Sequence, residues 1–140
     1  MSETAKAPWH LWVVGILTLL WNGVGIWSYT STQTGNLDGF GMSDEAIAYV
    51  TSFPAWADSL WALGVWGALA GSILLLLRSR FAVTALLVSV VGLVGTTVYQ
   101  RVLTELPADM AGIGIPIMIW AITLLTLWYA MRMRKQGVLR

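Results

Sequence analysis

The side chains best suited to binding chemistry lie in the middle of long apolar stretches. Trp21, Trp66 and Trp120 each fall about halfway along such a stretch, which is too deep for the aromatic belt of a membrane surface. Asn22 lies beside Trp21. An amide, hydroxyls and indole rings together suit an uncharged polar molecule, because they offer hydrogen bonds and flat apolar faces. The candidate binding residues are therefore Trp21, Asn22, Trp66, Thr96, Trp120 and Thr123.

Packing is the alternative role for these residues. Asn22 would then hydrogen-bond across helices, a contact that averages about 0.6 kcal/mol in membrane proteins. The tryptophans would fill space between helices.

A second polar group lies near one end of the same stretches and comprises Asp58, Gln100, Arg101 and Glu105. Arg101 and Glu105 are one helical turn apart and can pair, and Asp58 enters a neighbouring stretch at a similar depth. Such a cluster could gate a path or contact a substrate. Anchoring of helix ends is the alternative, because exposed ion pairs are common and weak.

Several kinds of chemistry are not expected. The chain has no cysteine, which removes thiolate metal sites and catalytic thiols, and its one histidine, His10, has no acidic neighbour to share a metal. Motifs of hydrolases, kinases and dinucleotide-binding proteins are absent from the sequence. We therefore predict no enzyme, no metal and no cofactor. A net charge of +1 also argues against nucleic acid as a partner.

Four apolar stretches must position these residues, and each is close to the roughly 20 residues that a helix needs to cross hydrocarbon. They span residues 9–32, 56–77, 81–104 and 112–131. A hydrophobic share of 57% and a mean hydropathy of +0.72 are typical of a multi-pass membrane protein. A cleaved signal peptide is the alternative for the first stretch, but the stretch is long and no small-x-small cleavage site follows it. We expect it to stay as an anchor.

Basic residues are sorted by side once these stretches are threaded through a membrane. All lysines and arginines except Arg101 fall on the face that carries both termini. Cytoplasmic loops carry the excess of basic residues, so we expect both termini in the cytoplasm. Anionic lipids are expected to bind the basic residues nearest the stretches, namely Arg78, Arg80, Arg132, Arg134 and Lys135.

Small and polar residues recur at steps of three and four in every stretch, the spacing that keeps one stripe of a helix facing a partner. We therefore predict an all-α, antiparallel, up-down-up-down bundle of four transmembrane helices. Gly67 and Gly71 form a GxxxG pair, for which packing inside the monomer is favoured over dimerisation. Pro116 lies either in the first turn of the last helix or deeper, where it would kink that helix.

The connector at residues 33–55 is long and polar, and it contains one predicted short amphipathic helix at about 44–53. Ser43 can cap this helix, and Asp44 and Glu45 suit its positive end. We expect it to lie on the outer leaflet, with a lid over the bundle as the alternative.

Three sequence blocks resemble a family of small four-span proteins of the bacterial inner membrane. The blocks are Leu20-Trp21-Asn22-Gly23, Thr32-Gln33-Thr34-Gly35-Asn36 and Ser52-Phe53-Pro54-Ala55-Trp56, accompanied by the run LLLLR from Leu74 to Arg78. The resemblance runs from Leu20 to about Tyr99. Members of that family are often labelled "sugar transporter". The resemblance implies a multi-pass location in the bacterial inner membrane.

The expected function is binding or transport of a neutral polar molecule, of a sugar-like kind, in the bundle interior. A non-catalytic accessory or assembly subunit of a larger membrane complex is the alternative. It is suggested by the lack of a charge near the membrane midplane and by the small mass outside the stretches. The assembled form is open between a homodimer and a larger complex.

Overall fold

The computed structural model describes residues 7–35, 43–104, 106–107 and 112–139, and over these residues the chain is helical with no strand. The helices are α1 (Trp9–Gln33), α2 (Asp44–Thr51), α3 (Ala55–Leu76), α4 (Phe81–Val98), the π-helical turn η2 (Tyr99–Leu103) and α5 (Gly114–Lys135). By length and composition, α1, α3, α4 with η2, and α5 can each cross a membrane. The chain is therefore a multi-pass membrane protein, and the four predicted spans are confirmed to within about one turn at each end.

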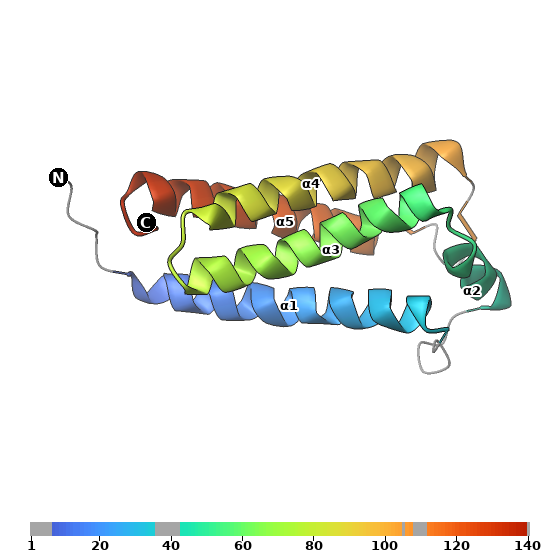
Figure 1. Cartoon of the computed structure of the whole chain (residues 1–140), viewed down its shortest axis with the longest axis horizontal. Coiled ribbons are helices and arrows are strands. Elements are labelled where there is room, and N and C mark those ends of the chain that lie inside the picture. Colours follow the sequence, from blue (N-terminus) through green and yellow to red (C-terminus); the bar gives the residue numbers. More distant parts are fainter. Residues whose placement is uncertain (1–6, 36–42, 105, 108–111, 140) are drawn as a thin grey trace.

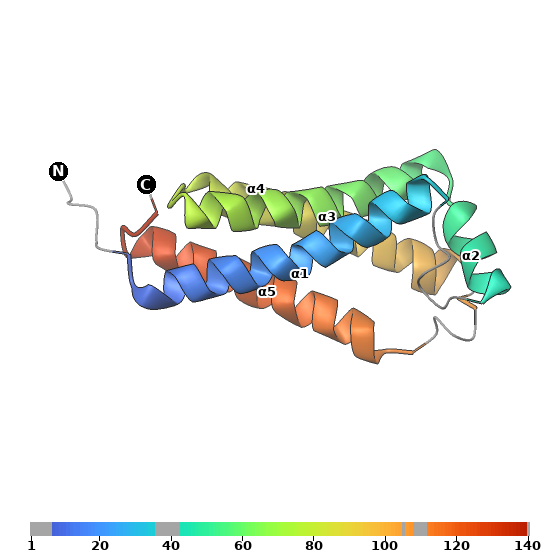
Figure 2. The same cartoon turned by 90° about the horizontal axis from the view of Figure 1, so that it is seen from below.

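The four long helices form an antiparallel bundle in which the chain runs up, down, up and down (Figure 1). Its two ends differ. We call the end with Trp9, the α3–α4 turn and the last turn of α5 the terminal end, and the opposite end the α2 end. α3 packs closely with α4, and α1 and α5 are attached to the outside of that pair. Figure 2 shows α5 diverging from its neighbours toward the α2 end.

Glycines explain why α3 and α4 come so close. A Cβ on Gly92 would lie only 2.4 Å from the backbone nitrogen of Gly64, and one on Gly67 would lie 2.9 Å from that of Ser89. The hydroxyl of Ser89 then donates to the Gly64 carbonyl oxygen at 2.7 Å. Gly71 faces Leu86 of the same hairpin. The prediction that the GxxxG pair packs inside the monomer is therefore confirmed.

The terminal end is closed by an apolar core to which all four long helices contribute. After α5 the chain reverses at Gly137, whose φ of +79° suits glycine, and it buries Val138 and Leu139. These two residues pack with a cluster that includes Leu11 of α1. A hydrogen bond between His10 and Tyr129 also joins α1 to α5 at this end.

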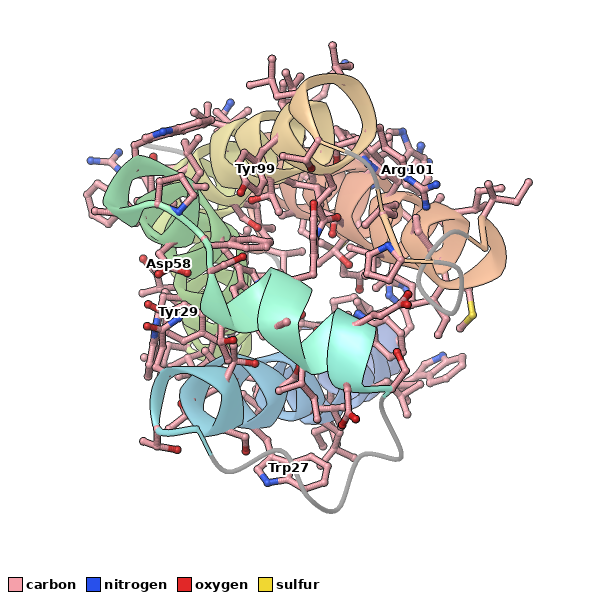
Figure 3. The ribbon with its side chains drawn as sticks, turned by 90° about the vertical axis from the view of Figure 1, so that its right-hand side faces the viewer. Trp27, Tyr29, Asp58, Tyr99 and Arg101 are labelled. Carbon is pink, nitrogen blue, oxygen red and sulfur yellow. The ribbon has the colours of Figure 1, made fainter. Side chains whose placement is uncertain are left out.

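The short helix α2 lies across the other end of the bundle (Figure 3). Ser43 caps it as predicted, accepting a hydrogen bond from the Ala46 nitrogen at 3.1 Å. Ala46 and Val50 are buried, and so is Phe53 just beyond the helix, its ring 4.8 Å from that of Tyr99. The expected position on the outer leaflet is therefore wrong, because the apolar side of α2 finds aromatic partners on the bundle itself.

Two features of the spans complete the fold. Pro116 lies in the first turn of α5, where a missing N–H costs no helical hydrogen bond, so no kink arises there. The third span ends in the π-helical turn η2, which the sequence analysis did not anticipate.

Candidate functional site

Asn22 is used as a bridge between two helices. Its amide nitrogen donates to the Ala68 carbonyl oxygen at 2.9 Å and to the Ser72 hydroxyl at 2.7 Å, both on α3. Ser72 in turn lies 3.1 Å from the hydroxyl of Thr18 on α1. Both amide hydrogens of Asn22 can therefore be donated to α3, which is the helix-packing role considered as the alternative to ligand binding.

Trp66 does not face the interior, which corrects its place among the candidate binding residues. Its side chain is 49% exposed near the middle of α3. The reason is the direction in which successive residues of α3 point around its axis. α3 turns Gly67 toward α4 and Ala68 toward α1, so the indole falls on the remaining, membrane-facing side.

The other candidates divide between two helix contacts. Trp120 on α5 donates from its indole nitrogen to the Thr97 hydroxyl of α4 at 3.1 Å. Thr96 is buried on α4 and bonds to the Gly92 carbonyl oxygen at 2.8 Å, and Thr123 is buried on α5. Trp21 is half-buried on α1. Over the described residues, every buried side-chain nitrogen or oxygen has a hydrogen-bond partner, so the predicted interior site consists largely of satisfied groups.

A hollow of about 360 Å³ opens instead at the α2 end, between the last turn of α1, the end of α2 and the first turn of α3. This volume falls in the range of small-molecule sites. Its lining residues are Thr32, Gln33, Thr34, Gly35, Val50, Thr51 and Asp58. Of this set, only Asp58 was among the candidate site residues predicted from the sequence, although Thr32 to Gly35 belong to one of the blocks that carry the family resemblance.

Asp58 and Gln33 form the chemical centre of this hollow. The Gln33 amide nitrogen donates to one carboxylate oxygen of Asp58 at 3.1 Å, which links α1 to α3. A carboxylate accepts hydrogen bonds and an amide both donates and accepts. The hydroxyls of Thr32, Thr34 and Thr51 already donate to carbonyl oxygens one turn earlier in the chain, so they can accept from a ligand. The available signal for Gln33 was its place in the polar run that follows the first span.

In the predicted cluster of Asp58, Gln100, Arg101 and Glu105, Asp58 does not meet Arg101. Asp58 and Arg101 lie on opposite sides of the α2 end (Figure 3). The guanidinium of Arg101 donates to the Gly112 carbonyl oxygen at 2.9 Å, beside the start of α5. Gln100 is half-buried in η2, and Glu105 lies outside the described residues. Similar depth in two spans does not imply the same side of the bundle.

An aromatic group beneath α2 was also missed by the sequence analysis. Phe53, Trp61 and Tyr99 make ring contacts there, and the Tyr49 hydroxyl hydrogen-bonds to that of Thr104 at 2.6 Å. Burial raises the pKa of Tyr49, partly offset by that hydrogen bond. Tyr49 and Phe53 are four residues apart, a spacing that could have predicted a shared contact face.

No family model, no curated protein and no solved structure matches this chain, so its identity rests on the four-span helical bundle described above.

Proposed function

We propose that the protein binds a small, neutral, hydroxyl-rich molecule at the α2 end and takes part in moving it across the membrane. The observation that carries the proposal is the hollow beside Asp58 and Gln33. Its volume of about 360 Å³ suits a ligand of sugar size. Neighbouring hydroxyls of such a ligand could donate to the carboxylate and accept from the amide.

The charge of the hollow favours a neutral ligand over an anion. Of the described residues in its lining, only Asp58 is ionisable, so an anionic group there would meet a like charge. The Gln33 amide already engages one carboxylate oxygen, which leaves the other oxygen for a ligand. A cation would compete for the same oxygen, so the ligand panel must contain cationic compounds.

Among the described residues, the hollow is lined from α1, α2 and α3 and not from α5, so movement beyond it is proposed to begin with a shift of α1 away from α5. These two helices touch only sparingly, whereas α3 and α4 are locked backbone against backbone. Near the α2 end, where α5 diverges from its neighbours, opening between α1 and α5 would disturb few packed groups. At the terminal end it would have to break the core that contains Leu11 and the hydrogen bond between His10 and Tyr129.

Orientation and location form part of the same proposal. Among the described residues, the basic ones at the terminal end outnumber the single Arg101 at the α2 end. We infer that the terminal end faces the cytoplasm of a bacterial cell and that the hollow opens outward.

The binding test is equilibrium dialysis of purified protein against labelled sugars, polyols, amino acids and organic cations. Asp58→Asn should weaken binding of the preferred neutral ligand about tenfold or more, since a hydrogen bond to a charged group contributes about 1.5 to 3 kcal/mol. Arg101→Gln is the control, because Arg101 lies at the same end on the opposite side. Binding that is unchanged in Asp58→Asn, or a panel of neutral solutes that fails to bind, would refute the hollow as the site.

A second candidate function is an accessory subunit of a larger membrane complex, and Trp66 favours it. This indole faces the membrane near the middle of α3, where lipid provides no hydrogen-bond acceptor. A partner helix would supply one. Gentle detergent extraction and native gel analysis should then recover a stoichiometric foreign protein, and Trp66→Leu should release it.

A further inference from the structure

Charge is strongly polarised between the two ends of the bundle. Among the described residues, the acidic side chains are Asp44, Glu45 and Asp58, and all lie at the α2 end. In the described part of the chain, the charged side chains of the terminal end are all basic, namely Arg78, Arg80, Arg132, Arg134 and Lys135. This end therefore attracts anions.

Arg78 differs from the other four basic residues because the fold itself uses it. It occupies the turn between α3 and α4 with a φ of +58°, and its guanidinium donates to the Val138 carbonyl oxygen at 3.1 Å. This contact ties the turn to the segment that follows α5. The expected lipid contact is therefore better assigned to the remaining four residues, which are exposed.

Two of those four basic residues, both arginines, are held over aromatic rings. The guanidinium carbon of Arg132 lies 5.5 Å from the ring centre of Trp128, and that of Arg80 lies 5.4 Å from the ring centre of Phe81. Both distances are within the range of a cation–π interaction. Both rings are themselves exposed, Trp128 by 56% and Phe81 by 58%. Each pair thus exposes an aromatic ring and a guanidinium group side by side on the outer surface of the bundle.

The depth of these pairs matches a membrane surface. Phe81 begins α4, and Trp128 lies two turns before the end of α5, at the same end of two adjacent spans. An aromatic ring at this depth sits at the boundary of the acyl chains, and a long basic side chain extends from it toward the headgroups. A guanidinium can bind a phosphate through two parallel hydrogen bonds.

We propose that Arg80 with Phe81, and Arg132 with Trp128, form two binding sites for the phosphate headgroups of anionic phospholipids. The ring contacts the upper acyl chain while the guanidinium binds the phosphate. Arg134 and Lys135 have no such ring contact among the cation–π pairs of the described residues, and they contribute only general attraction. This inference is independent of any ligand at the α2 end.

The test compares two double variants that remove the same charge from the same end. Arg80→Gln/Arg132→Gln removes the ring-supported cations, and Arg134→Gln/Lys135→Gln removes the others. Each protein is placed in nanodiscs with equal amounts of phosphatidylglycerol and phosphatidylcholine, and the retained lipids are identified by native mass spectrometry. Wild type should retain phosphatidylglycerol preferentially. The first variant should lose about fivefold in retention per site, the change expected for about 1 kcal/mol per basic residue, and the second should lose much less.

A ring variant and a free anion complete the experiment. Phe81→Leu/Trp128→Leu keeps every charge, and it should still lower phosphatidylglycerol retention. Millimolar inorganic phosphate should not displace the lipid, because it lacks the acyl chain that contacts the ring. The proposal is overturned if wild type shows no preference, if both charge variants lose retention equally, if the ring variant matches wild type, or if free phosphate displaces the lipid.

Discussion

The two ends of this bundle differ in the side chains that close them. The terminal end is closed by an apolar core in which Val138 and Leu139 fill the space between the long helices. The α2 end is covered by a separate short helix over aromatic rings, and it keeps a polar hollow at Asp58. Apolar packing without polar gaps gives a rigid closure, whereas a lid held by few contacts beside exposed polar groups can open at low cost. We therefore expect the terminal end to contribute most to the stability of the bundle and the α2 end to be the one that opens to admit a ligand.

The largest expected difference between the ends is their accessibility from outside the cell. Because the chain has no cysteine, Ser52→Cys at the α2 end and Gln136→Cys at the terminal end each introduce a single reactive thiol on an exposed residue. In intact cells, a membrane-impermeant maleimide should label Ser52→Cys and leave Gln136→Cys unlabelled. Both should react after the membrane is permeabilised, and the reverse pattern in intact cells would invert the proposed topology.

The next largest effect concerns the apolar closure. Leu139→Ala should lower the free energy of unfolding by about 2 to 4 kcal/mol, because it leaves a cavity in the core of the terminal end. Leu103→Ala deletes the same atoms at the α2 end, where the side chain is 59% exposed, and should change stability by less than about 0.5 kcal/mol. Unfolding by sodium dodecyl sulfate in mixed micelles measures both. Equal effects would remove the distinction between a packed and a loosely covered end.

The smallest effect concerns the attachment of α2. Tyr49→Phe keeps the ring but removes the hydrogen bond to Thr104, which should cost about 1 kcal/mol and loosen α2 locally. A nitroxide attached at Ser52→Cys should report that loosening as faster motion, with the terminal end unaffected.

The same label tests the pH dependence of α2. Burial raises the pKa of Tyr49 above its ordinary 10.0, so the folded state holds the phenol proton more tightly than the unfolded state does. The stabilising contribution is then complete below pH 10.0 and falls as pH rises through the folded pKa. Nitroxide mobility should therefore increase as the pH rises through the folded-state pKa of Tyr49. Tyr49→Phe should remove this transition, and a transition that persists in the variant would assign it to another group.

Much of the fold could be predicted because its determinants are local. The length and apolar character of each span and the capping of α2 by Ser43 depend on residues that are neighbours in sequence. The inward stripes were also predictable, since a glycine such as Gly67 or a hydroxyl such as that of Ser89 has little to gain from facing acyl chains.

The candidate site was predicted less well, because it depends on which helices become neighbours. Depth along a span can be counted from the sequence, and by depth alone Trp66 and Asn22 look equivalent. Direction around the helix axis separates them: Asn22 meets Ser72 of α3, whereas Trp66 lies beside the inward glycine stripe of α3 and faces the membrane. For the same reason Asp58 and Arg101 share a depth but lie on opposite sides of the bundle.

By itself, the sequence determined that four apolar helices cross a membrane and that basic residues gather on one side of it, because hydropathy and charge are properties of each residue in turn. Only the tertiary structure decided that α2 covers one end, that Val138 and Leu139 close the other, and that Gln33 and Asp58 meet in a hollow. Those contacts join residues far apart in the chain, and their existence depends on how whole helices pack against one another.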